Sequence, residues 1–186
     1  MTKSVKLERI STLTGSALLK NTTVLGSDTS VHSTGLAVVR STEDSVIVDL
    51  THIIQVPKDA QDLDAINIFA DQLEDFKRSV IGKHKIDKLI IEDTFFSQNV
   101  NVLKKLTRHG VLVYDRFRSV VKSAELMMPT SARNRIGFKA SIPKLPSPKL
   151  KKEIMKYIGD LLNIEVTQND IGDALVLALA GLAVKE

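Results

Sequence analysis

Runs of apolar residues in the first part of the chain predict a group of neighbouring strands. Residues 23–28 form an apolar run that is typical of a buried strand. Residues 35–40 and 45–54 are rich in apolar and β-branched residues, and the polar segment 41–44 between them is typical of a turn. The three segments together therefore predict an antiparallel meander.

Helices and strands are expected to alternate after this meander. A long helix should follow Pro57, because its apolar residues recur at intervals of three and four positions and Gly82 is suited to end it. Residues 87–92 have an apolar centre, which predicts a short strand in the middle of the sheet. Residues 100–109 predict another helix, with the next glycine as its cap.

The rest of the chain predicts one more strand and two helices. Residues 111–114 are interpreted as a fifth strand. Residues 129–148 contain four of the five prolines and are interpreted as a loop. Pro148 should begin a helix that runs to about residue 162, and residues 169–184 predict a final, strongly apolar helix. The pattern as a whole predicts an α/β fold with a mixed five-stranded sheet, flanked by helices.

Composition is consistent with one globular domain in a reducing compartment. We assign residues 23–186 to this domain and residues 1–22 to an N-terminal arm, which could instead be an added strand. No apolar run is long enough to cross a membrane, and no signal peptide is evident. The absence of cysteine excludes disulfides and thiolate zinc sites. We expect an intracellular protein that is not secreted, in the bacterial cytoplasm, an organelle or a virus-infected cell.

Charge is distributed unevenly along the chain. The net charge is only +4, but residues 104–156 contain 14 lysines and arginines and only 3 acids. The balance is reversed in residues 40–75, which contain nine acids. A concentrated basic segment predicts a surface that binds a polyanion such as nucleic acid, although it could also be an ordinary solvated face.

Four carboxylates stand at the ends of predicted elements. Asp28 and Glu92 each end an apolar strand, while Asp170 and Asp173 lie in the first turn of the last helix, on one face. Four such charges at one point would repel each other unless they shared cations. Mg²⁺ and Mn²⁺ prefer oxygen ligands, and two such ions suit the hydrolysis of a phosphodiester. These residues therefore predict a site for two metal ions.

Each acid also has a simpler interpretation. Asp28 could be a turn former, and Asp170 or Asp173 could cap the N-terminus of the last helix. A helix needs only one such cap, however, and the segment that Asp173 begins is almost wholly apolar. A turn-forming role explains Glu92 less well, because glutamate is a poor turn former.

The segments that contain these acids resemble the RuvC-type Holliday junction resolvases. Residues 26–35 resemble the first strand and turn of that family, and residues 91–99 resemble its second catalytic segment, in which a glutamate ends an apolar strand. Residues 170–175 resemble the closing Asp-x-x-Asp-Ala-Leu helix. The spacings of 64 and 78 residues between successive acids of these segments also suit the family.

This resemblance implies an RNase H-like fold, a homodimer, and paired symmetrical nicking of four-way DNA junctions. It implies that Asp28, Glu92, Asp170 and Asp173 bind two Mg²⁺ ions, for which Mn²⁺ would substitute. It also implies that Lys151 is a catalytic residue, with Lys149 and Lys152 as possible substitutes. A motor protein for branch migration is a possible further partner.

Several residues are expected to contact DNA. Phe95 would stack on an unpaired base, unless it is a core residue beside Phe96. The basic residues among them could instead be ordinary surface charge. The expected DNA contacts are Phe95, Asn99, Arg108, Arg133, Arg135, Lys149, Lys151 and Lys152.

Some features depart from the family pattern, and other functions are compatible with part of the sequence. The family's Asp-Pro-Gly is Asp28-Thr29-Ser30 here, and the loop at 129–148 is longer and more basic, as expected of a divergent viral or organellar branch. The same acids would serve a nuclease for flaps, forks or RNA, and an inactive junction-binding module would keep the basic surface. An actin-like ATPase would need about twice this length.

Overall fold

A single mixed sheet organises the part of the chain that the computed structural model describes, which is residues 4–93, 100–141 and 146–184. Its strands are β1 (Ser4–Lys6), β2 (Thr23–Asp28), β3 (Ser33–Ser41), β4 (Ser45–Gln55), β5 (Lys88–Glu92) and β6 (Ser123–Met127). They lie in the order β1-β4-β3-β2-β5-β6. β2, β3 and β4 are antiparallel, whereas β5 runs parallel to both β2 and β6. The predicted mixed α/β sheet is therefore confirmed.

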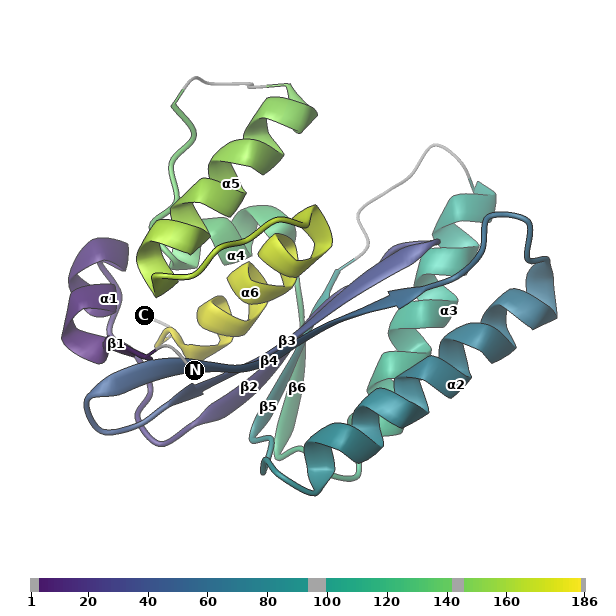
Figure 1. Cartoon of the computed structure of the whole chain (residues 1–186), viewed down its shortest axis with the longest axis horizontal. Helices are drawn as coiled ribbons and strands as arrows, with labels where there is room; N and C mark the ends of the chain where they lie inside the picture. Colours follow the sequence, from purple (N-terminus) through teal and green to yellow (C-terminus); the bar gives the residue numbers. More distant parts are fainter. Residues whose placement is uncertain (1–3, 94–99, 142–145, 185–186) are drawn as a thin grey trace.

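Helices cover both faces of this sheet (Figure 1). They are α1 (Leu7–Thr14), α2 (Asp62–Ile81), α3 (Val100–Phe117), α4 (Pro129–Arg135), α5 (Ser147–Leu162) and α6 (Asn169–Leu182). α2 and α3 lie side by side on one face, and the other four helices lie on the opposite face (Figure 1). Among the described residues, no helix combines the length and the apolar character that a bilayer span requires.

α6 is the central helix of its layer. Every residue from Ala174 to Leu182 is buried, because the helix packs against β2 and β3 below and against α4 and α5 above. Its many alanines allow it to lie close to the sheet. Gly26 and Gly35 permit the same approach from the strands: a Cβ at Gly26 would lie 2.2 Å from the carbonyl oxygen of Ala174.

The predicted strand at 111–114 is wrong. Those residues lie inside α3, which continues through Gly110 to Phe117. The valines there favour a strand locally, but the buried residues His109, Val113 and Phe117 recur every four positions, as in a helix that packs on one side. The long-range packing of this face against the sheet outweighs the local preference.

The sheet has six described strands rather than five: β6 was not predicted, and β1 lies in the segment for which an added strand was left as an alternative. β6 pairs in parallel with β5 along its whole length, but its sequence Ser-Ala-Glu-Leu-Met lacks the β-branched residues that mark a strand. β1 pairs with β4 at the opposite edge, so part of the N-terminal segment is an added strand. It is followed by α1, and Val5 and Ile10 are buried in the core.

The segment predicted as a loop at 129–148 begins with a helix. Pro129 occupies the first turn of α4, where a proline costs no hydrogen bond because its missing N–H would have no partner there. The remaining long helices lie close to their predicted positions: α2 ends before Gly82, α5 contains Pro148 in its first turn, and α6 begins at Asn169.

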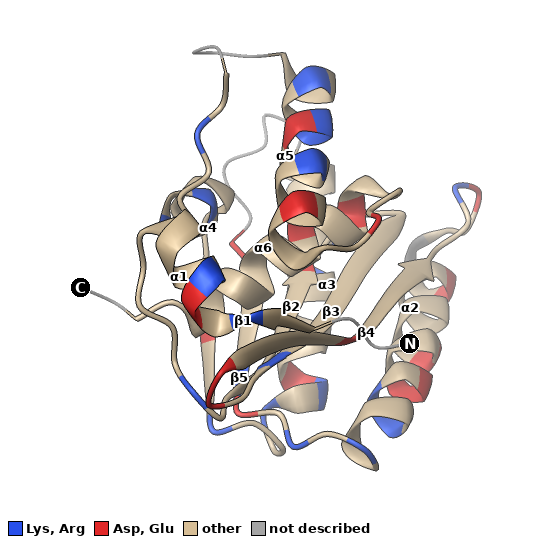
Figure 2. Ribbon diagram, turned by 60° about the vertical axis from the view of Figure 1, so that its left-hand side comes forward, with Lys and Arg blue, Asp and Glu red and all other residues tan. Residues whose placement is uncertain are grey.

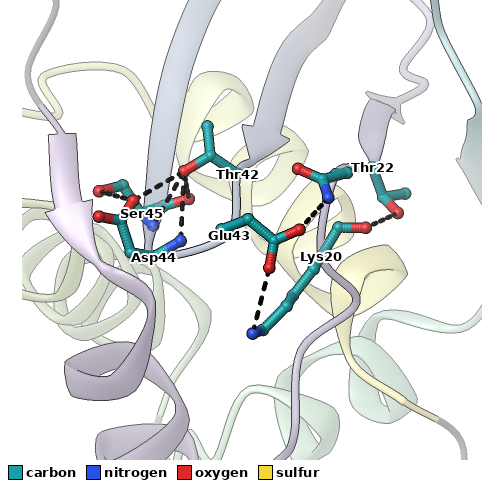
Figure 3. A network of polar contacts seen from close by, with 7 residues as sticks. Lys20, Thr22, Thr42, Glu43, Asp44 and Ser45 are labelled. Carbon is teal, nitrogen blue, oxygen red and sulfur yellow. Dashed lines mark hydrogen bonds and ion pairs between the residues drawn. The ribbon is translucent and has the colours of Figure 1, made fainter.

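A network of polar contacts holds the turn between β3 and β4 (Figure 3). Thr42 Oγ1 accepts a hydrogen bond from the N–H of Ser45, at 3.0 Å. Lys20 Nζ lies 3.3 Å from a carboxylate oxygen of Glu43, and this contact ties the turn to the segment that enters β2. This network therefore fixes the β3–β4 hairpin, which lies at the start of β2, whereas Asp28 lies at the other end of that strand.

Candidate active site

The ends of two parallel strands bring the first two carboxylates together. β2 and β5 are neighbours with Ser27 opposite Ile91, so Asp28 and Glu92 follow at the same edge of the sheet. Asp28 is only 7% exposed and shares a hydrogen bond with the side chain of Glu92. Two carboxylates held this close repel each other, so the pair favours a bound cation or a proton between them.

Asp170 in the first turn of α6 and Asp173, three residues further along the helix, reach the same edge, so only Asp170 occupies the first-turn position that was predicted for both. A Cβ at Gly35 would lie 2.0 Å from the backbone oxygen of Asp170, so only glycine lets this turn rest on the start of β3. Ser33, two residues earlier in β3, donates a hydrogen bond to the Asp170 carboxylate. These contacts fix Asp170 above the sheet edge that carries Asp28.

The other three acids act electrostatically on Asp28. Burial raises the pKa of Asp28 well above its usual range, and the hydrogen bond and charge of Glu92 raise it further, followed by the charges of Asp173 and Asp170. A buried carboxyl with a raised pKa beside three other acids fits a set of ligands for a cation. Asp28 thus lies within electrostatic reach of the other three predicted acids.

Two basic residues hold Asp173. Lys151 Nζ of α5 lies 3.4 Å from one carboxylate oxygen, and an Arg133 nitrogen of α4 lies 3.6 Å from the other. Burial alone would lower the pKa of Lys151, but the charges of Asp173, Asp28 and Asp170 raise it on balance. Lys151 therefore lies within the electrostatic reach of the whole cluster.

Within the described part of the chain, no three acidic or histidine side chains converge tightly enough to hold an ion as they stand. The charges of the other three acids nevertheless raise the pKa of Asp28, so the four lie near one another. Each carboxylate is turned toward a local partner, which explains why no three of them converge on one point. Asp28 is hydrogen-bonded to Glu92, and Asp170 accepts a hydrogen bond from Ser33. Asp173 forms ion pairs with Lys151 and Arg133. Because the donors are all carboxylate oxygens, the set fits a hard divalent cation such as Mg²⁺ or Mn²⁺.

The structure separates the other basic residues that were expected to contact DNA. Arg135 pairs with Glu125 of β6 at 3.0 Å. Arg108 borders a small cavity beside His32 and His109. Lys149 and Lys152 are exposed on α5, and the lysines along this helix are coloured blue in Figure 2. Phe95 and Asn99 lie outside the described residues.

Three residues that organise the site had no predicted role: Ser33, Gly26 and Gly35. A glycine within an apolar strand often marks the close approach of another backbone, so the two glycines carried a signal that could have been read. Ser33 carried none, because its partner Asp170 is 137 residues away in the sequence.

An apolar groove opens beside Glu92. It encloses about 300 Å³ between α3 and β6, and we call it the α3–β6 groove. The main apolar residues that line it are Ile91, Leu106, Val111, Tyr114 and Leu126. Val111, Tyr114 and Leu126 are 59%, 48% and 63% exposed, which is unusual for large apolar side chains gathered in one place.

Comparisons with known proteins agree with this geometry. The model of the family described as crossover junction endodeoxyribonuclease RuvC matches residues 24–181. No curated protein sequence matches the chain significantly.

Solved structures that resemble the chain include two of RuvC from Thermus thermophilus. In the one that contains a Holliday junction substrate, the TM-score is 0.64 at 13% identity, over 85% of this chain and 91% of that chain. In the other, the TM-score is 0.62 at 16% identity, over 87% and 98% of the two chains. The yeast mitochondrial Holliday junction resolvase Ydc2 has a TM-score of 0.53 at 14% identity, over 93% and 84%. At these identities the likeness shows the fold alone, and the predicted RNase H-like fold is confirmed.

Proposed function

We propose that this chain, which belongs to the RuvC family of crossover junction endodeoxyribonucleases, resolves four-way DNA junctions by paired, symmetrical nicks. Membership of this family implies a nuclease. The observation that carries the proposal is the convergence of Asp28, Glu92, Asp170 and Asp173 at one sheet edge, beside the basic side chain of Lys151.

The four carboxylates are the residues that would hold divalent metal, which RuvC-like nucleases generally use. We propose two Mg²⁺ ions, with Mn²⁺ as a substitute. When bound, such ions activate a water for attack on a phosphodiester and stabilise the leaving oxygen. They would also remove the repulsion that raises the pKa of Asp28.

Lys151 and Arg133 have distinct roles in this proposal. The ammonium group of Lys151 is held at the acid cluster, where it neutralises negative charge that develops on the scissile phosphate. Arg133 holds the second oxygen of Asp173 and thereby orients that carboxylate. Water adds to phosphorus, the bond to the 3′ oxygen breaks, and the products are a 5′-phosphate and a 3′-hydroxyl.

Cleavage of labelled synthetic DNA tests the substrate class. A four-way junction is compared with duplex, flap, fork and single strand, and with an RNA hairpin, in Mg²⁺ and in EDTA. We expect metal-dependent nicks only in opposing strands of the junction. Equal cutting of flaps and forks would indicate a broader nuclease for branched DNA, and stronger cutting of the hairpin would indicate an RNA nuclease. Tight junction binding without cutting would indicate an inactive module.

Basic residues lie on two helices that pack on opposite faces of the sheet. α3 contributes Lys104, Lys105 and Arg108, and α5 contributes lysines beside Lys151 (Figure 2). We propose that these residues hold the arms of the junction through its phosphates, with Phe95 and Asn99 as further DNA contacts. Phosphate contacts position a nucleic acid without reading its sequence, which suits an enzyme selective for branched structure.

Junction affinity should fall steeply with salt. Neutralising phosphates releases condensed cations, so about six to ten contacts would weaken binding by roughly 10³-fold or more between about 50 and 200 mM salt. The measurement is a titration of fluorescent junction in EDTA at several salt concentrations. A dissociation constant that stayed level over this range would contradict phosphate-based binding.

A second copy of the chain is the proposed occupant of the α3–β6 groove. β6 is one of the two edge strands of the described sheet, and its exposed Leu126 forms an apolar face with Val111 and Tyr114 of α3. The groove borders Glu92, so a two-fold interface here would hold two acid clusters in a fixed relation. Two linked sites are what paired nicks in opposing strands require.

Leu126→Glu should convert the dimer to a monomer, because it places a charge in the centre of this apolar face. Sedimentation velocity measures the change. Leu63→Glu is the matched control, since Leu63 is 72% exposed on α2, outside the groove. A Leu126→Glu protein that sediments like the wild-type dimer would place the interface elsewhere.

A further inference from the structure

The turn between β2 and β3 connects two of the four acids. Asp28 precedes it, and Ser33, which follows it, donates a hydrogen bond to Asp170. Within the turn, the Ser33 N–H donates to Ser30 Oγ at 3.1 Å, and the Ser30 N–H donates to Thr34 Oγ1 at 3.3 Å. The position of Ser30 therefore sets the position of Ser33, and through it the orientation of the Asp170 carboxylate.

A histidine from the opposite layer holds Ser30. His109 of α3 is 3% exposed, and its Nδ1 lies 2.9 Å from the carbonyl oxygen of Ser30. A carbonyl oxygen only accepts, so Nδ1 carries the hydrogen. The His109 ring stacks on Phe69 of α2, with centroids 4.1 Å apart and planes at 3°. α2 and α3 lie side by side (Figure 1), and the imidazole on α3 is held in place by the phenyl ring on α2.

Packing alone does not account for a histidine here. The layer around Phe69 is otherwise built from apolar residues such as Leu73 and Val113, which would fill the space without a polar group. Burying a ring N–H costs free energy unless it has a partner. The partner that it has is the backbone of the turn between Asp28 and Ser33.

We propose that His109 is a positioning residue for the reaction. Its hydrogen bond ties α3 to the β2–β3 turn, and the turn, through Ser33, fixes the carboxylate of Asp170 for metal binding. The inference deepens the proposed function and rests on it for the role of Asp170. It also connects the acid cluster to the helix that carries the apolar groove, because Gly110 and Val111 follow His109 directly.

Two substitutions separate the hydrogen bond from the stacking. His109→Phe keeps an aromatic ring against Phe69 but removes the donor, whereas His109→Asn keeps a donor near the position of Nδ1 but removes the ring. We expect His109→Phe to raise the Mn²⁺ concentration at the midpoint of the metal-induced Tm shift by about tenfold, and to slow single-turnover junction cleavage by a similar factor. Junction affinity in EDTA should not change.

The asparagine variant should recover most of both losses. Ser33→Ala should reproduce the His109→Phe effects, and Ser33→Thr, which keeps the hydroxyl, should recover them. The double variant Ser33→Ala/His109→Phe should be no worse than the more defective single variant, because both residues act through one chain of contacts.

A second stacked histidine provides the control. His52 of β4 stacks on Phe76 of α2, with centroids 5.4 Å apart and planes at 20°. His52→Phe removes the ring nitrogens and His52→Asn removes the ring, at a stacked pair that lies outside the β2–β3 turn. Neither variant should change the Mn²⁺ midpoint or the cleavage rate.

Two results would overturn the proposal. One is a His109→Phe protein with the wild-type Mn²⁺ midpoint and cleavage rate. The other is an asparagine variant as defective as the phenylalanine variant, with an equal loss of Tm, which would mean that the ring only packs. If the wild type fails to cut junctions while His109→Phe still shifts the Mn²⁺ midpoint, the proposed function fails and the positioning role stands.

Discussion

Glu92→Gln and Asp170→Asn should each abolish junction cleavage and leave junction binding intact. Both substitutions keep the size of the side chain but remove a negative charge from the cluster around Asp28. Removing one ligand or charge-stabilising group from such a site costs about 10²- to 10³-fold or more in rate. Binding should persist because it depends on basic residues and phosphates rather than on these acids.

Single-turnover cleavage and a binding titration in EDTA measure the two effects separately. Asp160→Asn is the matched control, because Asp160 is an exposed acid on α5 whose partner is Lys156. That variant should cut at the wild-type rate. A Glu92→Gln or Asp170→Asn protein that also cut at this rate would show that the substituted residue is not a metal ligand.

Gly35→Ala should lower the stability of the protein and its cleavage activity together. The added Cβ would lie 2.0 Å from the backbone oxygen of Asp170, so the first turn of α6 must move away from β3. Overpacking of this kind costs about 1–3 kcal/mol of the free energy of unfolding. The same movement displaces Asp170 from Ser33, and the metal site with it.

Urea unfolding and single-turnover cleavage report these two losses. Gly82→Ala is the control: this glycine ends α2 with φ −70°, and no atom lies within 4 Å of the position of the new Cβ. It should be neutral or slightly stabilising. If Gly35→Ala unfolded and cut like the wild type, the close approach of α6 to β3 would not be what positions Asp170.

The four acids could be predicted from the sequence because simple rules bring them together. Asp28 and Glu92 end apolar strands, and strands that are parallel neighbours end at the same edge of a sheet. Asp170 and Asp173 begin an apolar helix, which has to lie on that sheet to bury its surface. Local pattern and global fold agree on where these four residues lie, and their role as metal ligands stays a prediction.

Other features depend on contacts that no local pattern records. The valines of residues 111–114 favour a strand, and only the packing of α3 decides otherwise. The sequence left Lys149, Lys151 and Lys152 as alternatives, and the orientation of α5 places Lys151 at the acids. The roles of Ser33 and His109 depend on partners 137 and 79 residues away, which only the folded chain brings near.

Cleavage of a supercoiled plasmid with an extruded cruciform tests the central claim most directly. Paired nicks made within the lifetime of one complex linearise the plasmid, whereas unpaired nicks relax it to open circles. We predict linear product in Mg²⁺, none in EDTA, and none from a plasmid without the inverted repeat. Open circles as the lasting product, or equal cutting of the plasmid without the repeat, would contradict a resolvase that acts as a pair of metal-dependent sites.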